Sequence, residues 1–404
     1  MSAATPGIDS AYAWRLAGVS MLAVALGGGS IYLPVVALPQ MAAEFGGRRQ
    51  IPSLAYMLGF FGMGVGGVLM GWLADRAGPR VPLVIGGLSI AVGGYVAASG
   101  SMAALLLGYG VLLGLFGNSA TFTPAMNNVQ GWFERGRATA VAMVSVGPAI
   151  SGFFWPQLFN WLLPQMGWRQ VLTAFGLVGG LSLLVIALYV RPAPGRAPGV
   201  ARTAHPAPRL PMSSPALMAL FSAAGFCCCA AMAVPFVHMV AFCGDLGIAA
   251  QRGAEAVSLV LLTAIAATFA MGRLAERIGP LPTSLICSVI QVVSLSGYLF
   301  VDSVAGIYLL AVIHGIPYIA IVQGYALNLR HLYGPGIEGW RLGAVMLFAM
   351  AGMAAGGWLG GAIFDATLSY ARAFQAALLF NLVNLTLLGV LHLLARQGSR
   401  FTPA

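Results

Sequence analysis

The 404-residue sequence contains no lysine and only ten acidic residues, and charged residues make up 7% of it. A soluble domain carries roughly a quarter charged residues, so this composition excludes a protein whose whole surface faces water. All 20 basic residues are arginines, and they lie in short stretches between apolar runs rather than in one patch. The net charge of +10 therefore does not indicate nucleic-acid binding, and we expect no nucleic-acid partner.

Cysteine is also scarce, and its placement excludes two further classes of protein. Three of the five cysteines are consecutive, Cys227 to Cys229, inside an apolar run where they behave as small hydrophobic residues. Consecutive cysteines in a helix point in different directions, so neither a disulfide framework nor a metal site is expected. No phosphate-binding loop, dinucleotide fingerprint or nucleophile elbow is found either. We therefore expect no cofactor and no enzymatic activity.

Hydrophobic residues, at 59% of the chain, form runs long enough to cross a bilayer. A membrane helix needs about 20 apolar residues, and the runs lack the alternation typical of barrel strands. The expected fold is an all-α polytopic membrane protein. Its expected membrane helices cover approximately 12–38, 52–74, 81–101, 103–128, 137–163, 169–191, 214–242, 253–274, 281–301, 303–328, 339–364 and 370–395.

A short charged stretch between two of these runs occurs twice. Residues 71–80 read GWLADRAGPR, and residues 272–280 read GRLAERIGP, at an offset of 201. The same offset matches Glu44 with Asp245 and Gly46 with Gly247, and further along Arg169 matches Arg372 at an offset of 203. A repeat at a fixed offset indicates two copies of one structural unit. We therefore expect two pseudo-symmetric six-helix bundles.

The first copy resembles the signature loop of the major facilitator superfamily, G-x-L-a-D-r-x-G-r-k, although Pro79 departs from it. The resemblance covers essentially the whole chain. It implies halves at 1–191 and 214–404, joined by a Pro- and Arg-rich cytoplasmic linker at 192–213, that alternate access to a central site. It also implies a conformational latch, against the alternative that its arginines only fix topology. The expected latch residues are Gly71, Asp75, Arg76, Gly78, Arg80, Glu276 and Arg277.

The distribution of arginine predicts the orientation of the chain. With both termini inside, the inner segments hold 15 arginines and the outer loops 5, as the positive-inside rule requires. We expect a multi-pass, monomeric protein of the bacterial inner membrane, with the lipid bilayer and a small-molecule substrate as its partners.

A second motif indicates the branch of the superfamily. The segment from Trp132 to Ala138, WFERGRA, resembles the helix 4–5 signature of the monocarboxylate and oxalate–formate porters. The segment from Asp9 to Trp14 and the triplet Gly167-Trp168-Arg169 are also similar to that branch. The resemblance implies transport of a small organic anion with a proton or by exchange. Against it, 257–271 and 342–359 lack the charged residue that anion carriers often place there.

Polar side chains inside the runs are the expected substrate pathway, because burying them unpaired is costly. His314 near mid-span is read either as a proton or carboxylate site or as a histidine bonded to a neighbouring helix. His238 is read either as a gate or as a satisfied histidine near the outer mouth. The expected pathway residues are Tyr32, Asn118, Thr121, Gln157, Asn160, His238, His314, Tyr318 and Tyr325.

Two alternatives remain open at this stage. The stretch from Gly147 to Gly152 partly resembles the motif of proton-coupled drug exporters, although 102–128 lacks their usual arginine. A membrane sensor that has the fold without transport is the alternative of another class. Glycine-rich faces in 52–74 and 339–364 fit either static packing or sliding helices.

Overall fold

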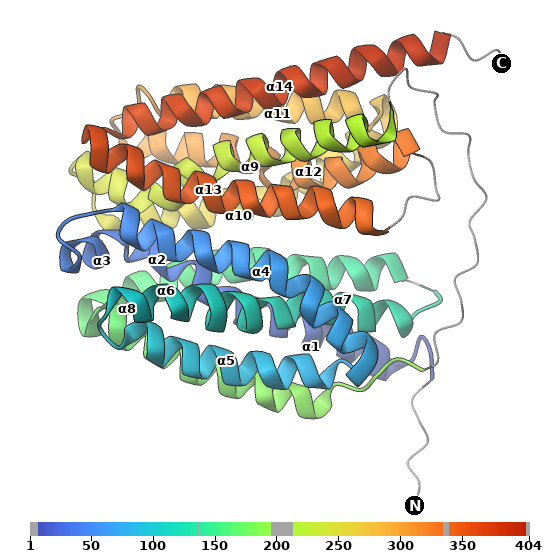
Figure 1. Cartoon of the computed structure of the whole chain (residues 1–404), viewed down its shortest axis with the longest axis horizontal. Coiled ribbons are helices and arrows are strands. Elements are labelled where there is room, and N and C mark those ends of the chain that lie inside the picture. Colours follow the sequence, from blue (N-terminus) through green and yellow to red (C-terminus); the bar gives the residue numbers. More distant parts are fainter. Residues whose placement is uncertain (1–6, 136, 195–212, 334–338, 401–404) are drawn as a thin grey trace, which may run out of the picture. The chain divides into compact units, whose positions relative to one another are not determined.

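The computed structural model describes residues 7–135, 137–194, 213–333 and 339–400, and every regular element within these ranges is helical (Figure 1). Helices are favoured because a bilayer offers no water to backbone groups. In the first half of the chain the elements are α1 (Ala11–Gly27), η1 (Gly28–Ile31), α2 (Leu33–Val36), α3 (Leu38–Glu44), α4 (Gln50–Ala77), α5 (Arg80–Ala98), α6 (Met102–Leu107), η2 (Gly108–Asn118), α7 (Ser119–Gly131) and α8 (Arg137–Tyr189). In the second half they are α9 (Ser214–Asp245), α10 (Ala250–Ile278), α11 (Pro280–Gly297), α12 (Val304–Tyr333), α13 (Gly339–Thr367) and α14 (Tyr370–Arg400).

Eleven helical stretches within the described residues are long and apolar enough to cross a membrane. One of them, Thr139–Tyr189 in α8, has 51 residues, or about 77 Å of helix, more than twice the hydrocarbon core. Gly167 interrupts α8 with φ 72° and ψ 163°, so this helix supplies two crossings. Within the described residues the crossings therefore number twelve, as the sequence predicts.

The chain forms two compact units. The first comprises Met1–Gly47 and Leu54–Gly199, and the second comprises Arg48–Ser53 and Val200–Ala404. In the first unit α5 and α1 pack on α8, and in the second α9 packs on α13 and α14 while α10 and α11 pack on α12. The boundary differs from the expected halves at Arg48–Ser53, which joins the second unit. Most of the expected linker, 192–213, lies outside the described residues.

The backbone repeats the sequence echo. Gly46 and Gly247 turn with φ of 70° and 71°, and Gly78 and Gly279 with φ of 81° and 92°. Gly167 with φ 72° is matched at the same offset by Leu368 with φ 53°. Because a positive φ is uncommon, three matched turns indicate two copies of one helical plan. They also keep the offset at 201 through residue 368, which makes Tyr370, rather than Arg372, the counterpart of Arg169.

The glycine-rich faces are sites of very close helix packing within each unit. A Cβ at Gly352 or Gly356 of α13 would collide with the carbonyl oxygens of Phe226 and Ala230 in α9. A Cβ at Gly62 of α4 would likewise collide with the carbonyl of Gly110 in η2. These glycines let the backbones touch, as small residues do between membrane helices.

Candidate functional site

The first polar cluster surrounds a break in the first membrane crossing. Helix α1 ends at Gly27, the chain continues as the 3-10 turn η1, and helix resumes at Leu33. Ser30 of η1 accepts a hydrogen bond from Asn118 Nδ2 at 3.0 Å, and both residues are buried. Thr121 lies one turn further along and donates to the Asn118 carbonyl at 2.8 Å. In some membrane transporters, a change in helix geometry within a membrane crossing contributes to the substrate site.

Glycine is required in this break because three elements meet there. A Cβ at Gly27 would lie 2.6 Å from Thr121 Cγ2, and a Cβ at Gly28 would lie 2.7 Å from Ser151 Oγ. Trp155 of α8 closes the same side and donates from Nε1 to the Ala25 carbonyl at 2.8 Å. The break therefore has side chains of η2, α7 and α8 packed directly against it.

Two buried polar atoms beside this break have no hydrogen-bond partner among the residues that the structure describes. They are Asn118 Oδ1 and Ser151 Oγ, in residues that are 3% and 1% exposed. An unpaired buried polar group costs about 1–3 kcal/mol, so such groups are rare without a reason. A bound molecule with its own donors and acceptors would satisfy both. We name Ser30, Asn118, Thr121 and Ser151 the η1 cluster.

The other expected pathway residues of the first unit lie near the η1 cluster or further along α8. Tyr32 donates to the Pro148 carbonyl at 3.3 Å. Gln157 and Asn160 are half-buried on α8, beyond Trp155. Sequence reasoning missed Ser30 and Ser151, because a serine in an apolar run has no pattern of its own.

His314 of α12 is buried among groups of the second unit that accept hydrogen bonds. Its Nδ1 lies 3.0 Å from Ser294 Oγ, and its Nε2 lies 3.3 Å from the Met232 carbonyl. The Ser294 hydroxyl can donate its one proton either to the Gln291 carbonyl, at 2.9 Å, or to His314 Nδ1. A neutral ring that accepts from Ser294 and donates to the Met232 carbonyl is therefore satisfied, as the bonded-histidine reading requires. The buried hydroxyl of Tyr298, whose ring centre lies 6.0 Å away, has no partner among the described residues.

His238 of α9 has a different environment. Its Nε2 lies 2.9 Å from the Gly357 carbonyl, and its Nδ1 lies 3.0 Å from the Tyr370 hydroxyl, which can donate to it. A neutral ring is fully satisfied by these two bonds. Of the two readings of His238, the contacts fit the satisfied histidine.

The two aromatic candidates on α12 both contact α9. Tyr325 is fully buried and donates to Asn384 Oδ1 at 2.8 Å, with the Ala224 carbonyl at 3.1 Å. This bonding joins three helices and is what a packing residue shows. Tyr318 is half-buried, with its ring centre 5.0 Å from that of Phe236. His314 also contacts α9, through Met232, so all three candidates on α12 lie against that helix.

The expected latch residues lie at helix ends. Arg80 binds the last carbonyls of α8, donating from Nε to Val190 at 2.5 Å and from Nη2 to Leu188 at 3.3 Å. The guanidinium of Arg76 lies 4.2 Å from the centre of the Trp72 ring. Asp75 is exposed, as are Glu276 and Arg277 at the end of α10, whereas Gly71 is buried and Gly78 provides the turn into α5.

The two segments that resemble the monocarboxylate branch meet in the structure. The Asp9 carboxylate accepts from the backbone N–H of Arg135 at 3.0 Å and from that of Glu134 at 3.2 Å. The ring centres of Trp14 and Phe133 lie 4.8 Å apart. Residues 125 positions apart in the sequence thus form one contact at the start of α1.

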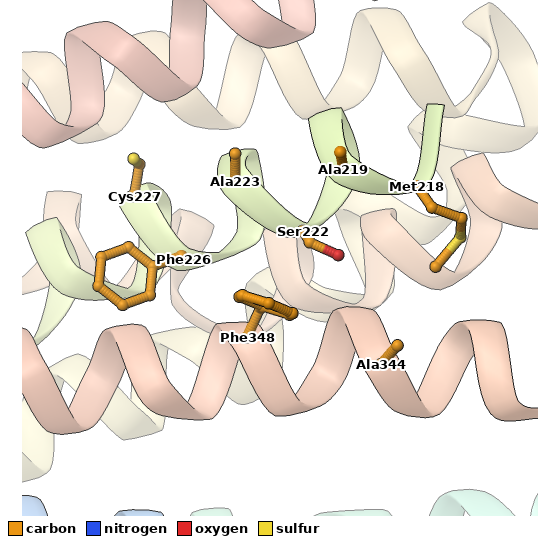
Figure 2. Close-up of a pocket in the computed structure, with 8 residues that line it drawn as sticks. All are labelled: Met218, Ala219, Ser222, Ala223, Phe226, Cys227, Ala344 and Phe348. Atoms are coloured by element: carbon orange, nitrogen blue, oxygen red, sulfur yellow. The ribbon is translucent and has the colours of Figure 1, made fainter. Parts of the chain in front are cut away.

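The second unit also holds an apolar cavity that the sequence did not reveal. It has a volume of about 670 Å³ and lies between α9 and α13. Figure 2 shows Ser222, Phe226 and Phe348 pointing into the space between the two helices. Its volume is within the range of ligand pockets. Ser222 is the lining residue that carries a hydroxyl group.

Comparison with known proteins agrees with this architecture. Monocarboxylate transporter 13 of Bos taurus is 28% identical over 81% of this chain and 76% of its own length. Monocarboxylate transporter 11 of Mus musculus is 27% identical over 69% of this chain and 63% of its own. A bacterial homologue of the human lysosomal transporter Spinster, crystallised inward-facing and occupied, superposes with a TM-score of 0.70 at 15% identity, covering 98% of this chain and all of that one.

Over the part of the chain that the structure describes, membrane-length helices in two related units and relatives that are transporters define a polytopic membrane transporter. The family model of the Major Facilitator Superfamily matches residues 20–324, and the chain belongs to that superfamily.

Proposed function

We propose that this transporter carries a small organic monocarboxylate together with a proton, by alternating access. The observation that carries the proposal is the η1 cluster with its two unpaired polar atoms. Asn118 Oδ1 can only accept, whereas the Ser151 hydroxyl can donate. One acceptor and one donor complement the O–H and C=O of a protonated carboxyl group. The names of the relatives support the same class of substrate.

Electroneutrality explains why no arginine is needed at this cluster. A monocarboxylate and a proton together carry no net charge, so the pair does not require a fixed cation in the membrane. Uncharged hydroxyl and amide groups are sufficient ligands. His314 is the proposed relay that passes this proton, because it is a titratable side chain buried within a membrane-spanning helix. We propose a monomer, and we propose that both termini are cytoplasmic because the inner segments hold most of the arginines.

The apolar cavity between α9 and α13 favours a second candidate function. A space of about 670 Å³ lined by Met218, Phe226 and Phe348 fits an apolar compound better than a carboxylate. Proton-coupled export of apolar or cationic compounds is therefore the alternative.

Uptake by proteoliposomes tests the proposal. The purified chain is reconstituted, and labelled L-lactate, pyruvate and benzoate are offered with and without an inward proton gradient. Saturable uptake that the gradient accelerates supports monocarboxylate–proton symport. No carboxylate uptake, together with gradient-driven movement of a hydrophobic cation such as ethidium, would favour the exporter. No flux of any compound would favour a sensor.

A further inference from the structure

Helices α9 and α13 touch at one place and diverge beside it. Where they touch, a Cβ at Gly352 of α13 would collide with the carbonyl oxygen of Phe226 in α9. Beside that contact lies the apolar cavity of about 670 Å³, between 218–227 of α9 and Phe348 of α13. The close contact of the two backbones therefore borders the cavity on one side.

The cavity lies at the depth of the membrane interior. Its two walls belong to Ser214–Asp245 and Ala344–Thr367, which are both long and apolar enough to cross a membrane. At a rise of 1.5 Å per residue, Met218 and Cys227 lie about 6 and 20 Å from the start of α9. None of the eight lining residues carries a charge. Because a charge inside the membrane is costly, the cavity favours an uncharged occupant.

One polar group is aimed into this apolar space. Ser222 is 7% exposed, and Figure 2 shows its hydroxyl between the two helices. A serine within a helix can donate to the carbonyl four residues earlier, as Ser145 does to Val141 at 2.9 Å. The Ser222 hydroxyl makes no hydrogen bond with any residue that the structure describes. A buried hydroxyl without a partner is destabilising, so a molecule with one hydrogen-bonding group would complement it.

The walls of the cavity present aromatic and sulfur surfaces. Phe226 contributes a ring from α9, Phe348 a ring from α13 and Met218 a thioether (Figure 2). The ring of Phe226 also packs against Phe380 of α14, with the ring centres 6.4 Å apart, so its position is supported without a ligand. Phenyl rings and thioethers both make favourable contacts with aromatic rings. The lining therefore favours an aromatic occupant over a saturated chain.

The repeat shows that the cavity is not part of the six-helix plan. At the offset of 201, the counterpart of Phe348 in the first unit is Gly147. A Cβ at Gly147 would lie only 2.9 Å from the Met21 carbonyl oxygen, so α8 and α1 are in close contact there. In the second unit, a Cβ at Gly225 would lie 3.7 Å from the Val345 carbonyl oxygen, which is an ordinary contact. The second unit departs from the shared plan where the cavity opens.

We propose that this space, the α9–α13 cavity, is a binding site for an uncharged aromatic compound that carries one hydrogen-bonding group. Phe226 and Phe348 contact the aromatic ring, and Ser222 binds the polar group. All lining residues belong to the second unit, so the site is distinct from the η1 cluster of the first. The proposal goes beyond carboxylate transport and does not depend on which compound the chain transports.

Direct binding of three related probes tests the proposal. The full chain is purified in detergent, and tritiated 1-naphthol, naphthalene and 1-naphthoate are offered in a scintillation proximity assay. We expect saturable binding of 1-naphthol and about fivefold weaker binding of naphthalene, which lacks the hydroxyl. We expect no binding of 1-naphthoate, which is charged. Absence of saturable 1-naphthol binding would overturn the proposal, as would equal binding of all three probes.

Substitutions then locate the bound probe. Ser222→Ala should weaken the binding of 1-naphthol about fivefold and leave that of naphthalene unchanged. Ser145→Ala, which removes a hydroxyl from α8 in the first unit, is its control and should change neither. Ala223→Trp fills the cavity and should abolish binding of both probes, whereas Ala366→Trp at the exposed end of α13 should not. Thermal denaturation checks that each variant is folded. Normal binding in both Ser222→Ala and Ala223→Trp would exclude the α9–α13 cavity.

A native thiol reports on the same cavity in a bilayer. Cys227 lines the cavity and is half-buried, whereas the other cysteines are buried. In proteoliposomes, N-ethylmaleimide should alkylate Cys227 about tenfold faster than Cys243, because thiol reactivity follows exposure, and 1-naphthol should slow only the reaction at Cys227.

Two results of this labelling would contradict the proposal. Equally slow labelling of Cys227 and Cys243 would mean that the cavity is closed. Labelling of Cys227 that 1-naphthol does not slow, and that accelerates when the lipid is exchanged for detergent, would assign the cavity to a lipid chain. Because no transported substrate is added, failure of carboxylate uptake does not affect either measurement.

Discussion

Asn118 Nδ2 donates to Ser30 Oγ at 3.0 Å and thereby joins the end of η2 to the break in the first membrane crossing. The amide oxygen of the same residue is buried without a partner among the described residues. One side chain thus holds the break in place and offers an acceptor beside it. Substitutions at this site should therefore have effects on stability and effects on transport that can be measured separately.

Replacing Asn118 should affect both stability and transport. Asn118→Ala removes the bond to Ser30 and the free acceptor, so we expect thermal stability to fall and uptake to fall at least tenfold, about 1.4 kcal/mol in the barrier. Asn128→Ala is the control, because Asn128 also makes two hydrogen bonds, to residues Arg191 and Ala193, but lies away from the η1 cluster. The control should lose stability while uptake per folded molecule stays near normal. Equal loss of uptake in both variants would mean that only folding was affected.

Replacing Ser151 should separate the two effects fully. Its hydroxyl binds no described residue, so Ser151→Ala deletes no protein hydrogen bond, and thermal stability should stay the same or rise slightly. If the hydroxyl binds substrate, the apparent KM for the carboxylate should rise about five- to tenfold. The measurement is initial uptake against substrate concentration in proteoliposomes. An unchanged KM would remove Ser151 from the site.

The fold was predictable because its signals are local. A run of about 20 apolar residues and a turn glycine at Gly78 or Gly279 each indicate a structure without reference to distant residues. The sequence indicates only that the segments containing Asp9 and Arg135 both resemble one family branch. Their contact is a finding of the structure.

The contacts of the site were much less predictable. Ser30 and Asn118 are 88 residues apart, and neither position has a pattern that singles it out from other polar residues in apolar runs. For Arg49 the sequence indicates only a charged loop residue, because its contacts with Asp245 and Asp365 involve distant helices. Tertiary packing, rather than sequence spacing, decides which polar side chains meet.

His314 should be needed to couple carboxylate uptake to the proton gradient. It should not be needed for folding or for carboxylate exchange. In His314→Gln we expect the inward proton gradient to stop accelerating uptake, because the amide cannot take up a proton at Nε2. Exchange of labelled for unlabelled carboxylate at equal pH should persist. His392→Gln, on the half-buried face of α14, is the control and should keep the response to the gradient. Gradient-driven uptake at the normal rate in His314→Gln would make the residue a packing residue.

The latch assignment predicts opposite behaviour for two neighbouring residues. Arg80 binds carbonyls at the end of α8 inside the first unit, so Arg80→Ala should lower the free energy of unfolding by about 1.5–3 kcal/mol, the usual contribution of a charged hydrogen bond. Asp75 is exposed at the end of α4, so Asp75→Asn should leave the amount of protein in the membrane unchanged. If Asp75 acts as the latch of the family, the same variant should still slow uptake severalfold, because one state of the cycle loses a charged contact. Thermal denaturation in detergent and uptake in proteoliposomes measure the two quantities on the same preparation. Normal uptake by Asp75→Asn would limit the loop to a structural role, carried by Arg80.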